Sequence, residues 1–461
     1  GVGCGSGAIK GQGAASPIAR RWAYPPAQRL SVTDDFHGTT VADPYRWLED
    51  ADSDQTRAWV ASQNELTASV VHTPAREALR DRLATLWDYA RYSLPIHAGD
   101  RYFFWKNDGL QDQPVLYVQP QLGAEPRVLL DPNASTDDGT TAITGDKASP
   151  DGRYMAYLSS SHGSDWQELR VRDVETGADT SERLQRCKFT QVAWAKDGSG
   201  FYYNRFPHED EVAPEDRNHY NRVYWHALGT PQEKDSLVME HVDDKELGFD
   251  PSVSHDGELL IMQVYRGTSP RNRLYTLDIR GGLQQDKPGA QVRRLFADED
   301  ASYVFLGKVG QTLYLATDLD APRKRVVAVD LRQPAPEHWR TVVPEPELAA
   351  EVIEDVKLYN GQLVVKTMRD ASNRLYVHAL SGERLREIAL PGIGSVPALS
   401  GDADRAEMFF EFMSFLRPTT SYRYALDSGD LQLMEDRAPT LPFDPEDFET
   451  GQIFVTSKDG T

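Results

Sequence analysis

The sequence is poor in cysteine, in basic residues and in long apolar runs. Its two cysteines, Cys4 and Cys187, stand far apart and outside any metal-ligand spacing, so neither a disulfide framework nor a zinc site is predicted. No apolar run approaches the ~20 residues that a membrane-spanning helix requires. Fifty basic residues against 71 acidic ones give a net charge of −21, which opposes binding to nucleic acid or to an anionic membrane.

Signatures of covalent chemistry are also missing. The sequence has no G-x-S-x-G elbow, no H-E-x-x-H helix, no P-loop and no G-x-G-x-x-G motif after a strand. Histidines such as His162, His208, His219 and His255 are scattered over turns and loops without metal-ligand spacing. We therefore expect no catalytic residue, no metal ion and no cofactor in this chain.

A turn followed by a short apolar strand recurs along the chain. Its clearest copy is residues 149–158, SPDGRYMAYL, where Asp151 and Gly152 form a turn pair and Tyr154 begins an aromatic and aliphatic run. The six further copies share a Gly- or Asp-containing turn and lie at residues 98–105, 196–203, 254–261, 310–315, 360–365 and 400–410. A companion strand follows each copy, at residues 115–119, 168–172, 222–226, 273–278, 325–330, 374–378 and 422–427.

The period of the repeat favours a ring. Copies spaced roughly 40 to 60 residues apart are typical of arrays and propellers. A unit of two hairpins buries only part of its apolar face, and closing such units into a ring covers those faces and leaves few sheet edges open. A β-sandwich with similar hairpins is the alternative. We predict a mostly β chain with a seven-bladed β-propeller over residues 88–437.

The flanking segments carry no blade pattern. Residues 1–23 are rich in Gly, Ala and Ser and predict a disordered leader; Val2-Gly3-Cys4 faintly resembles a lipidation site, but we favour a plain flexible leader. Residues 24–87 predict two helices, at 56–71 and 73–87, the second with Thr73 as N-cap and Pro74 at its first position. Residues 438–461 predict a proline-rich linker and then a strand at 452–457.

Several motifs resemble one known family. They are residues 41–50 (VADPYRWLED), 163–166 (GSDW), 188–190 (KFT) with 193–194 (AW), Gly267 with Pro270 and 272–274 (NRL), and 457–461 (SKDGT). In one order from residue 24 to the end, they resemble the amino-terminal part of prolyl oligopeptidase. The resemblance implies a seven-bladed propeller that caps an α/β-hydrolase domain. That domain would comprise the helical segment 24–87 and everything after the propeller, so it would be truncated at residue 461.

The resemblance also implies a function. It indicates a serine endopeptidase of the periplasm or cytoplasm, monomeric and soluble, that cleaves short peptides after proline. The Ser-Asp-His triad would lie beyond Thr461 and act by acyl transfer. The propeller would admit only small peptides. The expected partners are therefore short proline-containing peptides and the chain's own carboxyl-terminal hydrolase domain, with no nucleic acid and no membrane.

Three residues match substrate-side positions of the family. Phe189 matches a phenylalanine that helps to line the apolar site for the third residue before the cut, although a strand residue of the core is the alternative. Asp165 matches an acidic residue near the peptidase domain's substrate-binding arginine, although an aspartate that caps a turn is the alternative. Thr268 falls where many members have a cysteine near the active site. Gly248 replaces a larger apolar residue, which predicts a wider pocket, and Tyr265 stands where some members have an arginine.

Two other functions are kept as alternatives. The propeller could be a binding module that acts alone as an interaction scaffold, but the two helices then lack a partner. The chain could also resemble oligopeptidase B, which shares the Asp-Pro-Tyr-x-Trp-Leu element and cleaves after basic residues. Arg46 and the pair Glu49-Asp50 suit the proline-cleaving branch better.

Overall fold

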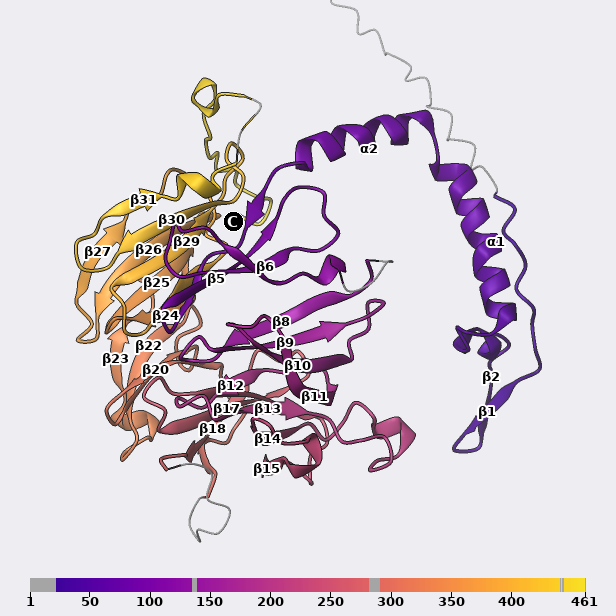
Figure 1. Cartoon of the computed structure of the whole chain (residues 1–461), viewed down its shortest axis with the longest axis horizontal. Coiled ribbons are helices and arrows are strands. Elements are labelled where there is room, and N and C mark those ends of the chain that lie inside the picture. Colours follow the sequence, from indigo (N-terminus) through magenta and orange to yellow (C-terminus); the bar gives the residue numbers. More distant parts are fainter. Residues whose placement is uncertain (1–21, 135–138, 282–290, 440, 442, 461) are drawn as a thin grey trace, which may run out of the picture. The chain divides into compact units, whose positions relative to one another are not determined.

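The computed structural model describes residues 22–134, 139–281, 291–439, 441 and 443–460. These residues form two compact units that divide between Trp87 and Asp88, and each unit is described by itself (Figure 1). The predicted leader, residues 1–23, lies outside the described residues up to position 21. None of the helices described is both long enough and apolar enough to cross a membrane.

The first unit contains a small hairpin and two helices. The hairpin pairs β1 (Thr33–Phe36) with β2 (Thr39–Ala42), and the helices are α1 (Asp54–Val71) and α2 (Pro74–Trp87). Both predicted helices are confirmed, each with a hydroxyl at its amino terminus. Oγ of Ser53 accepts a hydrogen bond from the Thr56 amide, and Oγ1 of Thr73 accepts one from the Arg76 amide, both at 3.2 Å. These bonds satisfy amide groups that the first helical turn leaves without partners.

The second unit is a ring of seven antiparallel sheets, which confirms the predicted seven-bladed propeller (Figure 1). Blade 1 contains β3 (Arg91–Tyr92), β4 (Ile96–Ala98), β5 (Arg101–Asn107), β6 (Val115–Gln119) and β7 (Arg127–Leu130). Blade 2 contains β8 (Ala142–Ala148), β9 (Tyr154–Ser160), β10 (Gln167–Asp173) and β11 (Asp179–Cys187). Blade 3 contains β12 (Val192–Trp194), β13 (Gly200–Arg205), β14 (Arg222–Ala227) and β15 (Ser236–Met239).

The remaining four blades repeat this order of strands. Blade 4 contains β16 (Leu247–Val253), β17 (Leu259–Arg266), β18 (Asn272–Asp278) and β19 (Arg293–Phe296). Blade 5 contains β20 (Tyr303–Val309), β21 (Thr312–Thr317), β22 (Arg325–Asp330) and β23 (Arg340–Val343). Blade 6 contains β24 (Glu351–Tyr359), β25 (Gln362–Arg369), β26 (Ser372–Ala379) and β27 (Arg384–Ile388). Blade 7 contains β28 (Leu399–Gly401), β29 (Glu407–Phe412), β30 (Thr420–Ala425) and β31 (Leu431–Leu433).

Short 3-10 helices occur in the connections. They are η1 (Arg46–Glu49), η2 (Pro132–Ala134), η3 (Pro214–Asp216), η4 (Gln232–Lys234), η5 (Pro336–His338), η6 (Glu435–Arg437) and η7 (Pro445–Asp447).

The repeated motif is the turn into the second strand of each blade. In blade 2, Gly152 has a left-handed φ of +70°, and Oγ of Ser149 accepts a hydrogen bond from the Tyr154 amide at 2.9 Å. The amide of Gly152 also donates to the Ser149 carbonyl at 2.8 Å. Blade 4 repeats the arrangement, with Oγ of Ser254 accepting from the Leu259 amide at 3.0 Å. The motif therefore recurs because a serine and a glycine close the same tight turn in different blades.

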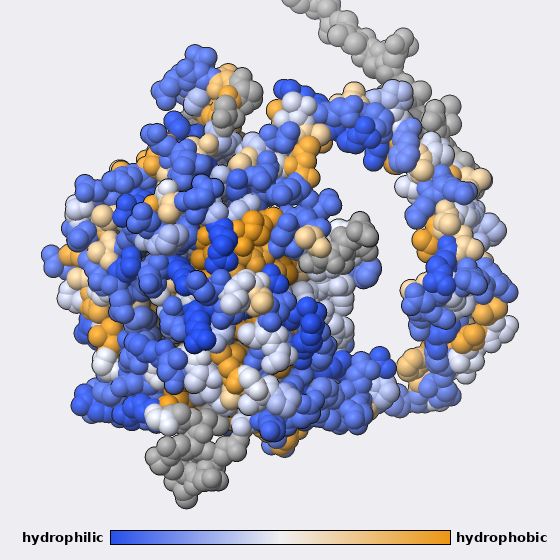
Figure 2. All heavy atoms as spheres, viewed as in Figure 1, coloured by the Kyte–Doolittle hydropathy of each residue, from blue (hydrophilic) through white to orange (hydrophobic). Residues whose placement is uncertain are grey.

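The core lies between neighbouring blades, where the faces of the sheets pack together. Phe201 and Tyr203 of β13 are fully buried against Leu158 and Leu169 of blade 2. Burial of each such side chain contributes roughly 1.5–3 kcal/mol. On the outside, Figure 2 shows that hydrophilic residues dominate the visible surface of the ring, in keeping with the excess of acidic residues.

The ring closes without an exchanged strand, because all four strands of blade 7 come from the carboxyl-terminal side of the ring. Side chains hold the seam between blades 7 and 1 instead. The Tyr102 hydroxyl donates to Glu407 at 2.8 Å, and the Ser400 hydroxyl donates to the Pro95 carbonyl at 2.7 Å. An apolar cluster fills the seam, formed by Leu94, Tyr102, Phe409 and Met434.

The strand predicted at residues 452–457 is absent from the described structure. Those residues have no paired strand, and Ile453, Phe454 and Val455 are 90%, 79% and 78% exposed. An isolated extended segment cannot form the hydrogen-bond ladder that defines a strand. A turn follows these residues, since the Gly460 amide donates to the Ser457 carbonyl at 3.0 Å.

Candidate functional site

The strand order gives the ring two distinct faces. Connections between antiparallel strands alternate between the two ends of a blade. The connections from second to third strands and from each fourth strand to the next blade therefore lie on one face, which we name the Phe189 face. The turns between first and second strands lie on the other face, which we name the His255 face, because His255 is in the turn between β16 and β17.

A channel runs along the inner strands between these faces. It encloses a cavity of about 690 Å³, lined by residues of blades 1, 2, 3, 4 and 7. Its wall is partly polar and includes His97, Asp146, Gln191 and Lys196. Burial raises the pKa of Asp146, although the indole Nε1 of Trp105 donates a hydrogen bond to this carboxylate at 3.0 Å. The channel can hold a small polar or charged group but no folded protein.

Phe189 lies in the bend between β11 and β12, and the interpretation of this residue as part of a core strand is wrong. Its φ is +51°, in the left-handed region, and its side chain is 61% exposed. Because β11 ends at Cys187 and β12 begins at Val192, the chain must turn here from the outer strand of blade 2 to the inner strand of blade 3. The bend presents an apolar ring at the Phe189 face, close to Thr190 and Gln191 at the channel wall.

A buried asparagine holds this bend in place. Asn204 of β13 is fully buried; its Oδ1 accepts a hydrogen bond from the Gln191 amide at 2.7 Å and its Nδ2 donates to the Phe189 carbonyl at 3.3 Å. The Thr190 hydroxyl donates to the Asn204 carbonyl at 2.8 Å. A left-handed non-glycine residue costs about 1–3 kcal/mol and persists where surrounding contacts over-determine it, a pattern found often at ligand sites.

Asp165 lies close to this bend. Its carboxylate is 3.3 Å from Nζ of Lys188, whose ammonium lies 5.4 Å from the ring centroids of both Trp166 and Phe189. The alternative reading of Asp165 as a turn cap is not seen, because Oγ of Ser164 accepts the hydrogen bond from the Trp166 amide. The structure therefore brings Asp165 and Phe189 together through Lys188.

Arg186 completes this cluster and has no sequence signal of its own. Its guanidinium stacks on Trp166 with 4.0 Å to the ring centroid and donates to the Pro207 carbonyl at 2.7 Å. Burial lowers its pKa, while Glu209 at 3.1 Å acts in the opposite direction. Arg186 thereby fastens the acidic loop at residues 206–221 to the rim of blade 2. Asn204 was also missed, since a single asparagine in an aromatic strand resembles an ordinary polar position.

Thr268 lies on the same face but in another blade. It is exposed in the turn between β17 and β18 of blade 4. Within the described part of the chain, neither a hydrogen bond nor an ion pair joins Thr268 to Phe189 or to Asp165. The three predicted residues thus share one face of the ring, and two of them share one cluster.

The wider pocket expected at Gly248 is not present. Gly248 pairs in register with Tyr265, and the aromatic ring of Tyr265 occupies the space that a Cβ of Gly248 would need. Burial raises the pKa of Tyr265 to about 12, and burial raises the pKa of the neighbouring Asp250 to about 6. The small residue makes room for a tyrosine and not for a ligand.

The chain enters and leaves the ring on the Phe189 face. The first strand, β3, pairs with the end of β5, and the guanidinium of Arg437 donates to the Ser93 carbonyl at 3.1 Å just after the last blade. The same guanidinium lies 4.2 Å from the ring centroid of Phe104. Both connections to the rest of the chain therefore start from the face that carries Phe189 and Asp165.

Turns of neighbouring blades are joined at the opposite face. The Gly99 amide donates to the Pro150 carbonyl at 3.0 Å between blades 1 and 2, and Nζ of Lys196 donates to the His255 carbonyl at 3.0 Å between blades 3 and 4. The Asn360 amide donates to the Ala403 carbonyl at 2.8 Å between blades 6 and 7. These bonds link the turns of neighbouring blades at the His255 face.

Comparisons with known proteins agree with this architecture. The family described as "Prolyl oligopeptidase, N-terminal beta-propeller domain" matches residues 24–437. The prolyl endopeptidase of Elizabethkingia meningoseptica is 32% identical over 441 residues, which are 95% of this chain and 60% of that protein. The dual function macrocyclase-peptidase POPB of Amanita bisporigera is 30% identical over 470 residues, which are 95% of this chain and 63% of that protein.

Solved structures are similar over the same span. A chain from a structural and mechanistic analysis of two prolyl endopeptidases has a TM-score of 0.84 at 30% identity, over 95% of this chain and 63% of that one. Prolyl oligopeptidase B of Galerina marginata, bound to a 35mer hydrolysis and macrocyclization substrate, has a TM-score of 0.82 at 26% identity, over 95% of this chain and 64% of that one. The chain therefore spans about three fifths of the length of the relatives it matches.

Proposed function

This chain belongs to the prolyl oligopeptidase family, and on that basis we propose that it is the propeller part of a serine endopeptidase that cleaves short peptides on the carboxyl side of proline. The observation that carries the proposal is the match of residues 24–437 to the family's amino-terminal propeller domain. The catalytic Ser-Asp-His triad belongs to a hydrolase domain that follows the propeller, where the serine attacks the carbonyl carbon and the histidine accepts its proton.

Apolar residues are exposed in segments that precede and follow the ring in the chain. Their exposure supports the proposal that another domain covers them. In α2, Leu79 and Leu83 are 64% and 53% exposed, although they form the apolar stripe of the helix. After the ring, Ile453 and Phe454 are 90% and 79% exposed. Apolar runs of this kind are usually covered by another surface. A hydrolase domain formed from residues 24–87 and residues after 437 would bury both.

The Phe189 face is the side from which the propeller would meet this domain. Both chain connections start there, and so do Phe189 and the pair Asp165–Lys188. We assign Phe189 to an apolar subsite for the third peptide residue before the cut and Asp165 to a contact with the hydrolase domain. Thr268 contributes to the same rim. The closed ring excludes folded proteins from the space between the domains, which selects for short peptides.

The first experiment compares the chain with and without its natural continuation. The continuous protein should hydrolyse a Gly-Pro reporter amide and leave a Gly-Arg reporter intact, while residues 1–461 alone should hydrolyse neither. Cleavage of the Gly-Arg reporter would favour the oligopeptidase B alternative. Turnover by residues 1–461 alone would contradict the assignment of the triad to later residues. Fractionation of the source cells separates the periplasm from the cytoplasm as the site of action.

A second experiment tests Phe189 in the continuous protein. Phe189→Ala should raise KM about 5- to 30-fold for peptides with an apolar residue three positions before the cut, because the peptide then loses an apolar contact with the Phe189 ring of roughly 1–2 kcal/mol. Peptides with glycine at that position should show no change. Val128→Ala, a truncation of a half-exposed apolar residue on the outer strand β7, is the matched control. An equal change in KM for both peptide classes would refute the subsite.

A further inference from the structure

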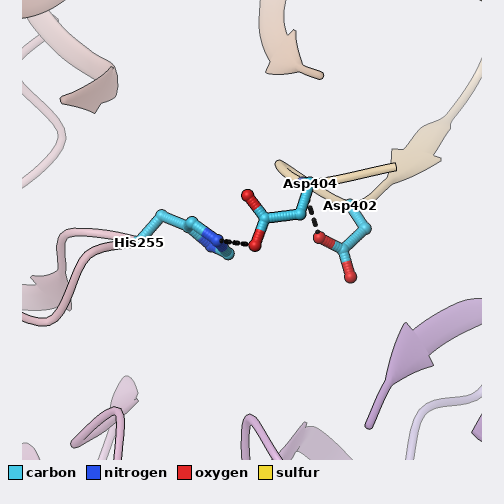
Figure 3. A group of neighbouring side chains, drawn as sticks. All are labelled: His255, Asp402 and Asp404. Carbon is cyan, nitrogen blue, oxygen red and sulfur yellow. Dashed lines mark hydrogen bonds and ion pairs between the residues drawn. The ribbon is translucent and has the colours of Figure 1, made fainter. Parts of the chain in front are cut away.

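One contact crosses the opening of the ring at the His255 face. Nε2 of His255, in the turn between β16 and β17 of blade 4, lies 2.5 Å from Oδ2 of Asp404, in the turn between β28 and β29 of blade 7. Blades 5 and 6 separate these turns on one side, and blades 1 to 3 separate them on the other. The two side chains therefore meet across the mouth of the channel, pointing toward each other as Figure 3 shows.

A second carboxylate points to the same place. Atoms of His255, Asp402 and Asp404 that can each ligate a cation all lie within 4.8 Å of one another. The Asp404 amide donates to Oδ1 of Asp402 at 2.9 Å, which orients the Asp402 carboxylate beside Asp404 (Figure 3). One imidazole nitrogen and two carboxylate oxygens are ligands that Zn²⁺ and similar divalent transition metals accept.

The surroundings of these three residues resemble an outer coordination shell. Nδ1 of His97 lies 3.0 Å from Oδ2 of Asp402, and the His97 side chain is only 7% exposed. Its other nitrogen, Nε2, is buried and has no hydrogen-bond partner among the described residues. Ligating carboxylates are usually held by such second hydrogen bonds, which fix their orientation. Nζ of Lys196 donates to the His255 carbonyl and holds the backbone of that turn.

We propose that His255, Asp402 and Asp404 bind a divalent transition metal ion that braces blades 4 and 7 across the mouth of the channel. The nitrogen and oxygen atoms need to separate only slightly, from a hydrogen bond of 2.5 Å to the spacing of ligands around an ion. His255 and Asp404 are exposed, with side chains 45% and 73% accessible, so the ion reaches the site from solvent. The bound ion closes the channel at the face opposite Phe189. This inference does not depend on the proposed peptidase activity.

The test is a titration of residues 1–461 with Zn²⁺ after removal of metal by a chelator, followed by calorimetry. The unaltered chain should bind one equivalent at this site. His255→Ala and Asp404→Asn should each lose at least about 100-fold in affinity, and His97→Gln should lose about 10-fold, as outer-shell changes usually do. Binding of Co²⁺ should give visible d–d absorption in the unaltered chain that is lost in His255→Ala.

Two controls keep the result interpretable. His338→Ala removes an exposed histidine from η5 of blade 5 and should leave the titration unchanged. Without metal, the variants should keep the Tm of the unaltered chain, because the side chains of His255 and Asp404 are exposed. Zinc binding that is equally tight in His255→Ala, or absent from the unaltered chain, would overturn the metal site and leave an ordinary His–Asp hydrogen bond.

Hydrogen exchange tests whether the bound ion links blades 4 and 7. Zn²⁺ should slow amide exchange in the turn at residues 254–257 and in the turn at residues 402–405 together, although 144 residues, 258–401, lie between them in the chain. Asp404→Asn should abolish the protection of both turns. Protection of only one turn would refute the link across the channel even if zinc binds.

Discussion

Arg437 lies at the seam where the ring closes and contacts blade 1 from just after blade 7. The ring has no exchanged strand between blades 7 and 1, so side chains must hold that seam. Arg437 is 5% exposed, donates to the Ser93 carbonyl at 3.1 Å and lies over Phe104 at 4.2 Å and over Tyr92 at 5.4 Å. We expect Arg437→Ala to loosen this seam in particular.

The size of the effect follows from these contacts. A hydrogen bond from a charged donor contributes about 1.5–3 kcal/mol, and stacking of the guanidinium on aromatic rings adds about 1–2 kcal/mol. Burial of the charge works against these gains, since it lowers the pKa of Arg437. The net loss should be about 2–4 kcal/mol. In a unit of this size each kcal/mol lowers Tm by roughly 1–2 °C, so Tm should drop by about 2–8 °C.

Hydrogen exchange with peptide resolution is the assay that locates the change. Exchange should become faster in β3 to β5 and in β28 to β31, while blades 3 and 4 keep their protection, because they lie away from the seam. Arg437→Met keeps the apolar stem of the side chain and should recover part of the stability. Arg183→Ala is the control, since the ion pair of the exposed Arg183 with Glu168 contributes less than about 1 kcal/mol.

Two results would refute this account of closure. If Arg437→Ala leaves Tm and the exchange of blades 1 and 7 unchanged, the seam is held by its apolar cluster alone. If exchange increases equally in all blades, the ring unfolds as one cooperative unit and has no weak seam.

Three further predictions concern buried groups. Burial raises the pKa of Asp250 to about 6, so the contribution of Asp250 to the free energy of unfolding is complete below about pH 4 and is lost as the pH rises through 6. In chemical denaturation, Asp250→Asn should match the stability of the unaltered chain at pH 4 and exceed it at pH 8 by about 1–3 kcal/mol. Burial raises the pKa of the Cys187 thiol to about 12, so a chain with Cys4→Ser should show no thiol reactive to a chromogenic disulfide at pH 8 until it is denatured, and then one. Gly248→Ala should cost about 1–3 kcal/mol because the methyl group meets the Tyr265 ring, and Tyr265→Leu in the same chain should recover part of that loss.

Each of these predictions has a control and a contrary result. Asp210→Asn changes an exposed aspartate and should leave the pH dependence of stability unaltered; an equal effect of both substitutions would contradict the role of burial. Rapid reaction of the thiol in the native Cys4→Ser chain would show that blade 2 opens locally at Cys187. An unchanged Tm in Gly248→Ala would show that the Tyr265 ring can move aside at no cost.

The second and third strands of each blade could be predicted from the local sequence, because each carries a recognisable pattern of residues. The second strand follows a turn of Ser, Asp and Gly and is mostly apolar, as β9 is. In the third strand apolar and polar residues alternate, as they do in β10. Outer strands were missed because they are short and exposed; all three residues of β31 are exposed and carry no amphipathic pattern. Inner strands such as β12, with three residues, are too short for a period to be read.

The residues that match substrate-side positions of the family were identified only by resemblance, and the structure shows their surroundings. A strand residue of the core is the alternative that the sequence offers for Phe189, yet this residue adopts a left-handed bend. The bend is imposed by Asn204, which lies 15 residues away in the chain and binds both sides of it. Strand propensity is judged from residues adjacent in the sequence, so it takes no account of a hydrogen-bond partner as distant as Asn204.

From the sequence alone, the repeat determined the number of blades, and the ordered motifs determined the family. Tertiary structure alone decided that Tyr265 fills the space beside Gly248, that Arg437 seals the ring, and that His255 meets Asp404 across the channel. The physical reason is the closure of the ring. Each blade is built from contacts between residues close in the chain, but the last blade returns to the first, where Tyr102 and Glu407, 305 residues apart, form a hydrogen bond. Closure also brings blade 4 opposite blade 7, so that side chains 149 residues apart lie within hydrogen-bonding distance.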